Sequence, residues 1–162
     1  PFSNLDAPHR NIIKQVIDDI CEKQLITCIL VSHDPEDLLA WADKILVLKE
    51  GRIIQQASPE QVYRQPVNEY CAALFGPFNS IDNKLAGALL REMYSGRRLF
   101  LRPEQLHLSK LKEGIAGSVQ KVSFRGSYYA VEVAVSNQML LVKTNNKQFA
   151  KGDTVYVSVN QP

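Results

Sequence analysis

The sequence predicts an α/β unit in its first half and a small all-β unit in its second half. Apolar residues recur at helical spacing between residues 12 and 21, and a nearly continuous apolar run, Ile26–Val31, follows them. Such a run is typical of a strand that is covered on both faces of a parallel sheet. From Leu99 onward, short segments of alternating hydrophobicity are separated by turn residues, as in antiparallel strands.

Caps and spacing define the elements expected in the first half. Pro8 suits the first turn of a helix, and Asp34-Pro35 opens another helix with a capping acid and an early proline. Ser58 and Gln61 have the spacing of a capping box, and Asn68 can cap a further helix. The expected strands are the run at 26–31, a strand at 44–49 and, after the tight turn Glu50-Gly51, a returning strand from Ile53.

The second half predicts a small barrel of the oligonucleotide/oligosaccharide-binding (OB) kind, because several short strands follow one another closely. Asp82–Tyr94 is expected to be a helix, with Leu85, Leu89 and Met93 four residues apart. Gly76-Pro77 marks the expected boundary between the two halves. The strands expected here are Leu99–Leu101, Leu106–Leu108, Ile115–Phe124, Tyr128–Val135, Met139–Lys143 and Thr154–Val159.

Composition supports a folded protein with a hydrophobic core. Hydrophobic residues make up 45% of the chain and charged residues 22%, and the net charge of +2 gives no strong attraction to nucleic acid. No apolar run approaches the ~20 residues of a membrane span, so we expect no crossing of a bilayer. Cys21, Cys28 and Cys71 lack paired spacing, and we expect buried thiols in a reducing cytosol, with neither a disulfide framework nor a metal site.

The strongest local signal for function is Ser32-His33-Asp34, directly after the apolar run. In open α/β sheets, ligands bind beyond the carboxyl ends of the strands. A histidine ring there can place a nitrogen on a ligand oxygen, and its charge responds to local fields near neutral pH. A histidine that merely closes a turn has the same local sequence, so the residues alone leave both interpretations open.

Three blocks place this histidine in a known context: Pro1–Asp6, Ile29–Asp34 and Ala42–Gln55. Their order and spacing resemble those of the ATP-binding subunits of ABC importers. The resemblance implies the C-terminal lobe of a P-loop nucleotide-binding domain, in a family that hydrolyses ATP between two such subunits arranged head to tail. It implies that His33 is the switch histidine that contacts the γ-phosphate. The residues that match the D-loop, which meets the partner's phosphate loop, are Ser3, Asn4, Leu5 and Asp6.

The sequence departs from this family in the motifs that hold phosphate. It contains neither G-x-x-x-x-G-K-[ST] nor Leu-Ser-Gly-Gly-Gln, and the family's catalytic glutamate would precede Pro1. We therefore expect a fragment that has no measurable ATPase activity by itself. ATP and Mg²⁺ are expected in the intact protein, with neither bound to the fragment. Because the sheet would lack neighbouring strands, we also expect apolar surface to be exposed in the first half.

The second half carries a looser resemblance. Leu101–Leu106, which contains Arg-Pro-Glu, and the block 114–159 are similar to the TOBE domain of importer ATPases. The resemblance divides the chain into an ATP-binding part at 1–76, a helical connector at 77–97 and a TOBE-like OB barrel at 98–162. It points to importers of iron, sulfate, polyamines, molybdate or sugars without choosing among them.

The same resemblance implies partners and a location. Expected partners are a second ATP-binding subunit, which makes a homodimer, and the transmembrane permease subunits. A substrate-binding protein is expected to act only indirectly, and no nucleic acid is expected. The expected location is the cytoplasm, peripheral on the inner face of the cell membrane.

Two other functions stay open for the barrel. Aromatic residues beside charge, such as Phe124, Arg125 and Tyr129, would suit stacking with single-stranded nucleic acid. We interpret them instead as barrel core and solvated charge, because the net charge is low. Arg102, Lys121 and Arg125, with backbone amides at the turns, are candidates for binding a small oxyanion or a regulatory ligand.

Overall fold

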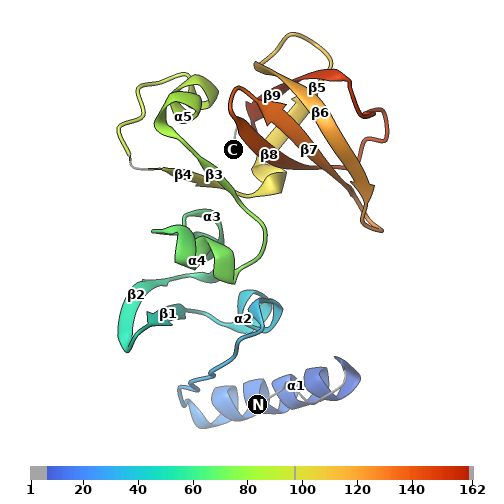
Figure 1. Cartoon of the computed structure of the whole chain (residues 1–162). Helices are drawn as coiled ribbons and strands as arrows, with labels where there is room; N and C mark the ends of the chain where they lie inside the picture. The colour runs from blue at the N-terminus through green and yellow to red at the C-terminus, as the bar shows by residue number, and fades with distance from the viewer. Residues whose placement is uncertain (1–6, 97, 161–162) are drawn as a thin grey trace.

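The computed structural model describes residues 7–96 and 98–160, and these residues pack around separate hydrophobic cores in the two halves of the chain (Figure 1). Helices and a hairpin form the first half, drawn in blue to green. A curled antiparallel sheet forms the second half, drawn in yellow to red.

The first half confirms the expected helices and the hairpin. Its elements are α1 (Ala7–Gln24), α2 (Pro35–Trp41), β1 (Ile45–Lys49), β2 (Arg52–Ala57), α3 (Pro59–Arg64) and α4 (Glu69–Leu74). The turn between β1 and β2 has φ of 52° at Glu50 and 75° at Gly51, the positive values that a tight hairpin turn needs. Ser58 and Gln61 form the expected capping box, and the Asn68 side chain accepts the N–H of Cys71.

The core of the first half lies between the hairpin and the short helices. Leu38 and Leu39 of α2 pack against this core from the side. Its buried members are Ile45, Val47, Val62, Cys71 and Phe75.

The apolar run at 26–31 is not a strand, and this prediction is wrong. It has no regular secondary structure, and Ile29 and Val31 are 86% and 77% exposed. A strand needs neighbours for its backbone hydrogen bonds. Within residues 7–96 and 98–160, every paired strand is antiparallel and none pairs with this run.

The apolar face of α1 lacks a covering layer as well. Ile12, Val16 and Ile20 are exposed, although their helical spacing predicted a buried face. The helix itself is confirmed, but the sheet that would cover it is absent from the described part of the chain. The expected exposure of apolar surface in the first half is therefore confirmed.

The second half confirms all six expected strands to within one residue at each end. Five of its strands form one antiparallel sheet in the order β5-β9-β6-β7-β8, which leaves β5 and β8 as its edges. The sheet curls like half of a barrel (Figure 1). Its elements are β3 (Asn79–Ile81), α5 (Asn83–Leu90), β4 (Leu99–Leu101), the 3₁₀ turn η1 (Pro103–Gln105), β5 (Leu106–Ser109), β6 (Ile115–Phe124), β7 (Tyr129–Val135), β8 (Gln138–Thr144) and β9 (Thr154–Val159).

One face of this sheet is buried beneath α5. Val131, Val133 and Val135 are completely buried, as their alternation along β7 predicts. Leu85 and Leu89 of α5 join the same core. The second half therefore has an apolar interior of its own.

Helix α5 is shorter than the expected Asp82–Tyr94. It begins at the cap Asp82 but ends at Leu90, because Arg91 adopts a left-handed conformation with φ of 57°. The N–H groups of Arg91 and Glu92 both bond to the carbonyl of Gly87, which closes the helix. Met93 is consequently 99% exposed, so its expected place on the buried face is wrong.

The segment expected to be a helical connector also contains a strand, β3, which pairs with β4. The buried side chain of Asn79 explains its position. Asn79 bonds to both the N–H and the carbonyl of Leu141 on β8, at 2.7 and 2.9 Å. One amide side chain thus joins the β3–β4 pair to the edge of the larger sheet.

A pair of glycine substitutions tests the close packing of this sheet. A Cβ at Gly114 would lie 2.3 Å from the carbonyl oxygen of Val157, whereas Gly126 has open space around it. Both glycines have positive φ, so the pair separates steric clash from backbone strain. We expect Gly114→Ala to lower the free energy of unfolding by on the order of 3 kcal/mol, and Gly126→Ala by about 1 kcal/mol. Urea unfolding measures both, and equal losses would contradict the packing described.

Candidate functional site

The expected D-loop, Ser3, Asn4, Leu5 and Asp6, lies outside the described residues, which begin at Ala7. Helix α1 follows these four residues directly along the chain. Helix α1 is therefore the first described element after these residues, and its contacts are the ones that the structure shows next to them.

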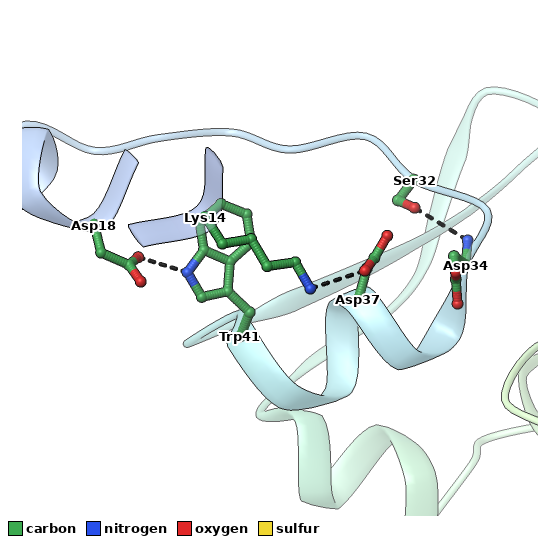
Figure 2. Close-up of polar contacts among 6 residues, drawn as sticks. All are labelled: Lys14, Asp18, Ser32, Asp34, Asp37 and Trp41. Atoms are coloured by element: carbon green, nitrogen blue, oxygen red, sulfur yellow. Dashed lines mark hydrogen bonds and ion pairs between the residues drawn. The ribbon is translucent and has the colours of Figure 1, made fainter. Parts of the chain in front are cut away.

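His33 lies in a bend between the irregular segment and α2, and its side chain is exposed. The hydroxyl of Ser32 accepts the N–H of Asp34 at 3.0 Å, which shapes the turn just before α2 (Figure 2). The imidazole is thus presented to solvent beside a defined helix start. It is accessible to a ligand, although residues 7–32 before it form no strand.

Polar side chains hold α1 against α2 (Figure 2). Lys14 of α1 forms an ion pair of 2.8 Å with Asp37 of α2, whose carboxylate is almost completely buried. The indole N–H of Trp41 donates to Asp18 at 2.5 Å. The ammonium of Lys14 also lies 5.8 Å from the centre of the Trp41 ring, a distance at which cation and ring attract each other.

These contacts join two helices. Lys14 lies on α1, which follows residues 3–6 in the sequence, and Asp37 lies on α2, which follows His33, so their ion pair links these two helices. Sequence reasoning missed Lys14, Asp18 and Asp37. The helical spacing of Lys14 and Asp18 placed them on one polar face, but nothing in the sequence identified α2 as its partner.

Arg102 occupies a different position from the one expected of a ligand-binding residue. It is 1% exposed, and its guanidinium points into the junction between the two halves. Nε donates to the carbonyl of Tyr63 at 2.9 Å. One terminal nitrogen donates to the carbonyls of Ala72, Gly76 and Pro77 at 2.9, 3.0 and 3.2 Å. Arg102 thereby satisfies carbonyls at the ends of α3 and α4.

Tyr63 and Glu104 complete this junction. The Tyr63 hydroxyl donates to Glu104 at 2.6 Å, and the Arg102 guanidinium lies 4.3 Å from the centre of the Tyr63 ring. Burial and the hydrogen bond to Glu104 raise the pKa of Tyr63 to about 12. Burial also lowers the pKa of Arg102, opposed by the nearby Tyr63 and Glu104. The other terminal nitrogen of Arg102 is buried without a hydrogen-bond partner.

The other two candidates for anion binding do not join Arg102. Lys121 is exposed on β6 and forms a loose ion pair of 3.7 Å with Glu132 on β7. Arg125 is exposed in the turn between β6 and β7. The Arg102 side chain is buried and donates hydrogen bonds to backbone carbonyls. It therefore does not present its charge to an anion in solvent together with Lys121 and Arg125.

The aromatic residues considered for base stacking lie around the same β6–β7 hairpin. Phe124 packs on Tyr129 with ring centres 5.3 Å apart, and Lys143 lies over the Tyr128 ring at 4.5 Å. Tyr128 and Tyr129 are partly buried, while Phe124 is exposed. All three rings are thus already in contact with neighbouring side chains.

Comparison with known proteins decides the family. A family model described as the TOBE domain matches residues 99–161. Over 99% of its length, the chain is 30% identical to the Fe(3+) ions import ATP-binding protein FbpC of Photobacterium profundum. The chain is homologous to ABC importer ATP-binding subunits over nearly its whole length.

Other members of this family match most of the chain too. The spermidine/putrescine import ATP-binding protein PotA of Mesomycoplasma hyopneumoniae is 30% identical over 90% of the chain. The glucose import ATP-binding protein GlcV of Saccharolobus solfataricus is 30% identical over 82%. The chain covers 51% of the Photobacterium protein, 36% of the Mesomycoplasma protein and 42% of the Saccharolobus protein. It therefore spans about half the length of these relatives or less.

Among the helices of residues 7–96 and 98–160, none combines the length and the apolar character that a bilayer span requires.

Replacing Arg102 tests its role at the junction. Arg102→Met would leave the carbonyls of Tyr63 and Ala72 without their charged donor, so we expect unfolding free energy to fall by about 3 kcal/mol. Arg125→Met, at an exposed turn, is the matched control and should change it by less than ~0.5 kcal/mol. Chemical denaturation measures both, and a similar small effect at the two sites would refute the junction role.

A pH series tests the environment of Tyr63. Its pKa of about 12 in the folded protein lies above the ordinary value of about 10. The fold thus favours the neutral phenol, and this stabilisation is complete below pH ~10 and is lost as the pH rises toward 12. We expect Tyr63→Phe to lose less stability than the wild type between pH 9 and pH 11.5. Parallel losses in the two proteins, measured by urea midpoints, would show that Tyr63 titrates normally.

Proposed function

We propose that this chain works as the C-terminal part of an ABC importer subunit in which ATP hydrolysis drives the uptake of a solute. The observation that carries the proposal is the 30% identity to an iron import ATP-binding protein over 99% of the chain. That match extends through both halves, so it includes the segment around His33 as well as the TOBE domain.

In this proposal, His33 contacts the γ-phosphate of ATP and helps to hold the attacking water in line. Phosphoryl transfer depends on positioning and on stabilisation of charge, and a solvent-accessible imidazole can supply both. Asp6 and its D-loop neighbours would meet the phosphate loop of the second subunit. The Lys14–Asp37 pair would keep the D-loop helix and the histidine turn in register.

The chain's own residues do not fit a complete nucleotide site. The phosphate-loop motif, whose backbone cradles phosphates and whose hydroxyl binds Mg²⁺, does not occur in the sequence. Within the described ranges, no group of three or more His, Cys, Asp or Glu gathers as metal ligands. We accordingly propose that ATP and Mg²⁺ act in the intact protein, and that this chain by itself does not hydrolyse ATP.

Partners and location follow from the same proposal. The subunit would pair with a second copy in a homodimer and dock on permease subunits at the cytoplasmic face of the membrane. Pairing and docking would be divided among three parts of the subunit: the ATP-binding part at 1–76, the connector at 77–97 and the TOBE-like part at 98–162. The family assignment does not favour the alternative of a nucleic-acid or oxyanion-binding module.

The solute belongs to the classes that such importers carry. The relatives are named for import of Fe(3+) ions, spermidine and putrescine, and glucose. Because these matches have nearly equal identity, they leave the choice among iron, sulfate, polyamines, molybdate and sugars open.

A chimeric subunit tests the proposal. The aligned segment of the Photobacterium relative is replaced by this chain, and ATP hydrolysis is measured with a coupled phosphate-release assay. We expect the chimera to hydrolyse ATP and His33→Ala to lower its rate at least ~100-fold, as the loss of a preorganised phosphate contact does.

Two controls accompany the chimera. His107→Ala, at an exposed histidine on β5, should keep the rate of the unmodified chimera. The 162-residue chain alone should show no turnover. An active chimera whose His33→Ala variant matches its His107→Ala variant would remove His33 from the mechanism.

A further inference from the structure

The end of α1 brings two cysteines together. Leu25 adopts a left-handed conformation with φ of 52°, and the N–H of Ile26 bonds to the carbonyl of Cys21 at 3.2 Å. This is the closing bond of a Schellman motif, which reverses the chain at a helix end. Cys28 stands only two residues beyond Ile26, so the returning chain passes beside Cys21.

The two side chains meet at this reversal. After the burial of Cys21 itself, the nearby Cys28 thiol is the next cause that raises the pKa of Cys21, which places the two thiols near each other. Cys28 is exposed and Cys21 is half-buried, while Cys71 is completely buried in α4. The expectation of buried thiols is thus confirmed for Cys71 and wrong for Cys28. A backbone reversal and the contact between the thiols therefore mark one accessible dithiol.

We propose that Cys21 and Cys28 form a reversible disulfide when the protein meets a two-electron oxidant of the peroxide class. Both cysteines carry free thiols in this structure. The bond would close a ring of the eight residues 21–28, across the Schellman turn that already holds its ends together.

The reaction balances with hydrogen peroxide. The Cys28 thiolate attacks one peroxide oxygen, so that an S–O bond forms and the O–O bond breaks. The other peroxide oxygen leaves as hydroxide and becomes water when it takes up a proton. The sulfur of Cys21 then attacks the Cys28 sulfenic acid; an S–S bond forms, and the Cys28 oxygen leaves as a second water with the Cys21 proton. Two thiols lose two electrons, the peroxide gains them, and a dithiol reductant reverses the change.

Exposure determines the order of these steps. Partial burial and the neighbouring Cys28 raise the pKa of Cys21 above its usual value, which keeps Cys21 protonated at first. Cys28 is open to solvent and meets the peroxide first. Cys21 then acts as the resolving thiol, which suits its position against the helix end.

The disulfide would act on the segment that leads to His33. Cys28 lies within the run at 26–31, which ends directly before Ser32-His33. A bond to Cys21 would fix the start of this segment on the helix that follows the D-loop. Any effect on ATP hydrolysis rests on the proposed function, whereas formation of the bond does not, so the two can fail separately.

Peptide mapping of the whole chain tests the bond. Lys23 lies between the two cysteines, so trypsin separates peptide 15–23 from peptide 24–44 unless a disulfide joins them. After brief treatment with hydrogen peroxide and blocking of remaining thiols, we expect the two peptides to appear joined in a non-reducing digest. We expect dithiothreitol to separate them and only Cys71 to carry the blocking label before reduction.

Variants show which thiols take part. Cys21→Ser and Cys28→Ser should each abolish the joined peptides, while Cys71→Ser, at the buried thiol, should leave them at the wild-type yield. If a variant fails to fold, the wild-type digest still shows whether the disulfide forms. Over-oxidised Cys28 beside unreacted Cys21, disulfide-linked dimers through Cys28, or joining only after denaturation would each overturn the proposal.

Discussion

The two halves of this chain are joined by one buried cation. The Arg102 guanidinium comes from the second half and bonds to carbonyls at the ends of α3 and α4 and in the linker that follows. The Ala72 carbonyl also accepts the N–H of Phe75, and a buried carbonyl without a donor is costly. Tyr63 and Glu104 surround the same charge, so the junction works as a unit. These hydrogen bonds connect the second half of the chain to α3, α4 and the linker that follows them.

The rest of the first half depends more on polar contacts than on a large apolar core. The Lys14–Asp37 pair and the Trp41–Asp18 bond hold α1, while the apolar face of that helix stays exposed. These contacts join α1 to α2, the helix that follows His33.

Local chemistry made much of the fold predictable. The caps Ser58, Asn68 and Asp82 start their helices where the sequence indicates, because each side chain accepts nearby backbone N–H groups. The strands of the second half were predictable because apolar and polar residues alternate along them, which indicates one buried face. The conformation of the run at 26–31 was not predictable. A strand forms only beside neighbouring strands, and the composition of the run does not show whether such strands are present. In the site, motif spacing identified His33, but it did not reveal Lys14 or Asp37.

By itself, the sequence determined the helix starts, the antiparallel strands and the family-specific blocks around His33, since these depend on residues close together in the chain. Tertiary structure alone decided that Arg102 is buried at the junction of the two halves, and that Cys28 lies near Cys21. The physical reason is that both features depend on how separate parts of the chain are brought together in space. The burial of a charge depends on carbonyls up to 39 residues away, and the meeting of two thiols depends on the left-handed turn at Leu25.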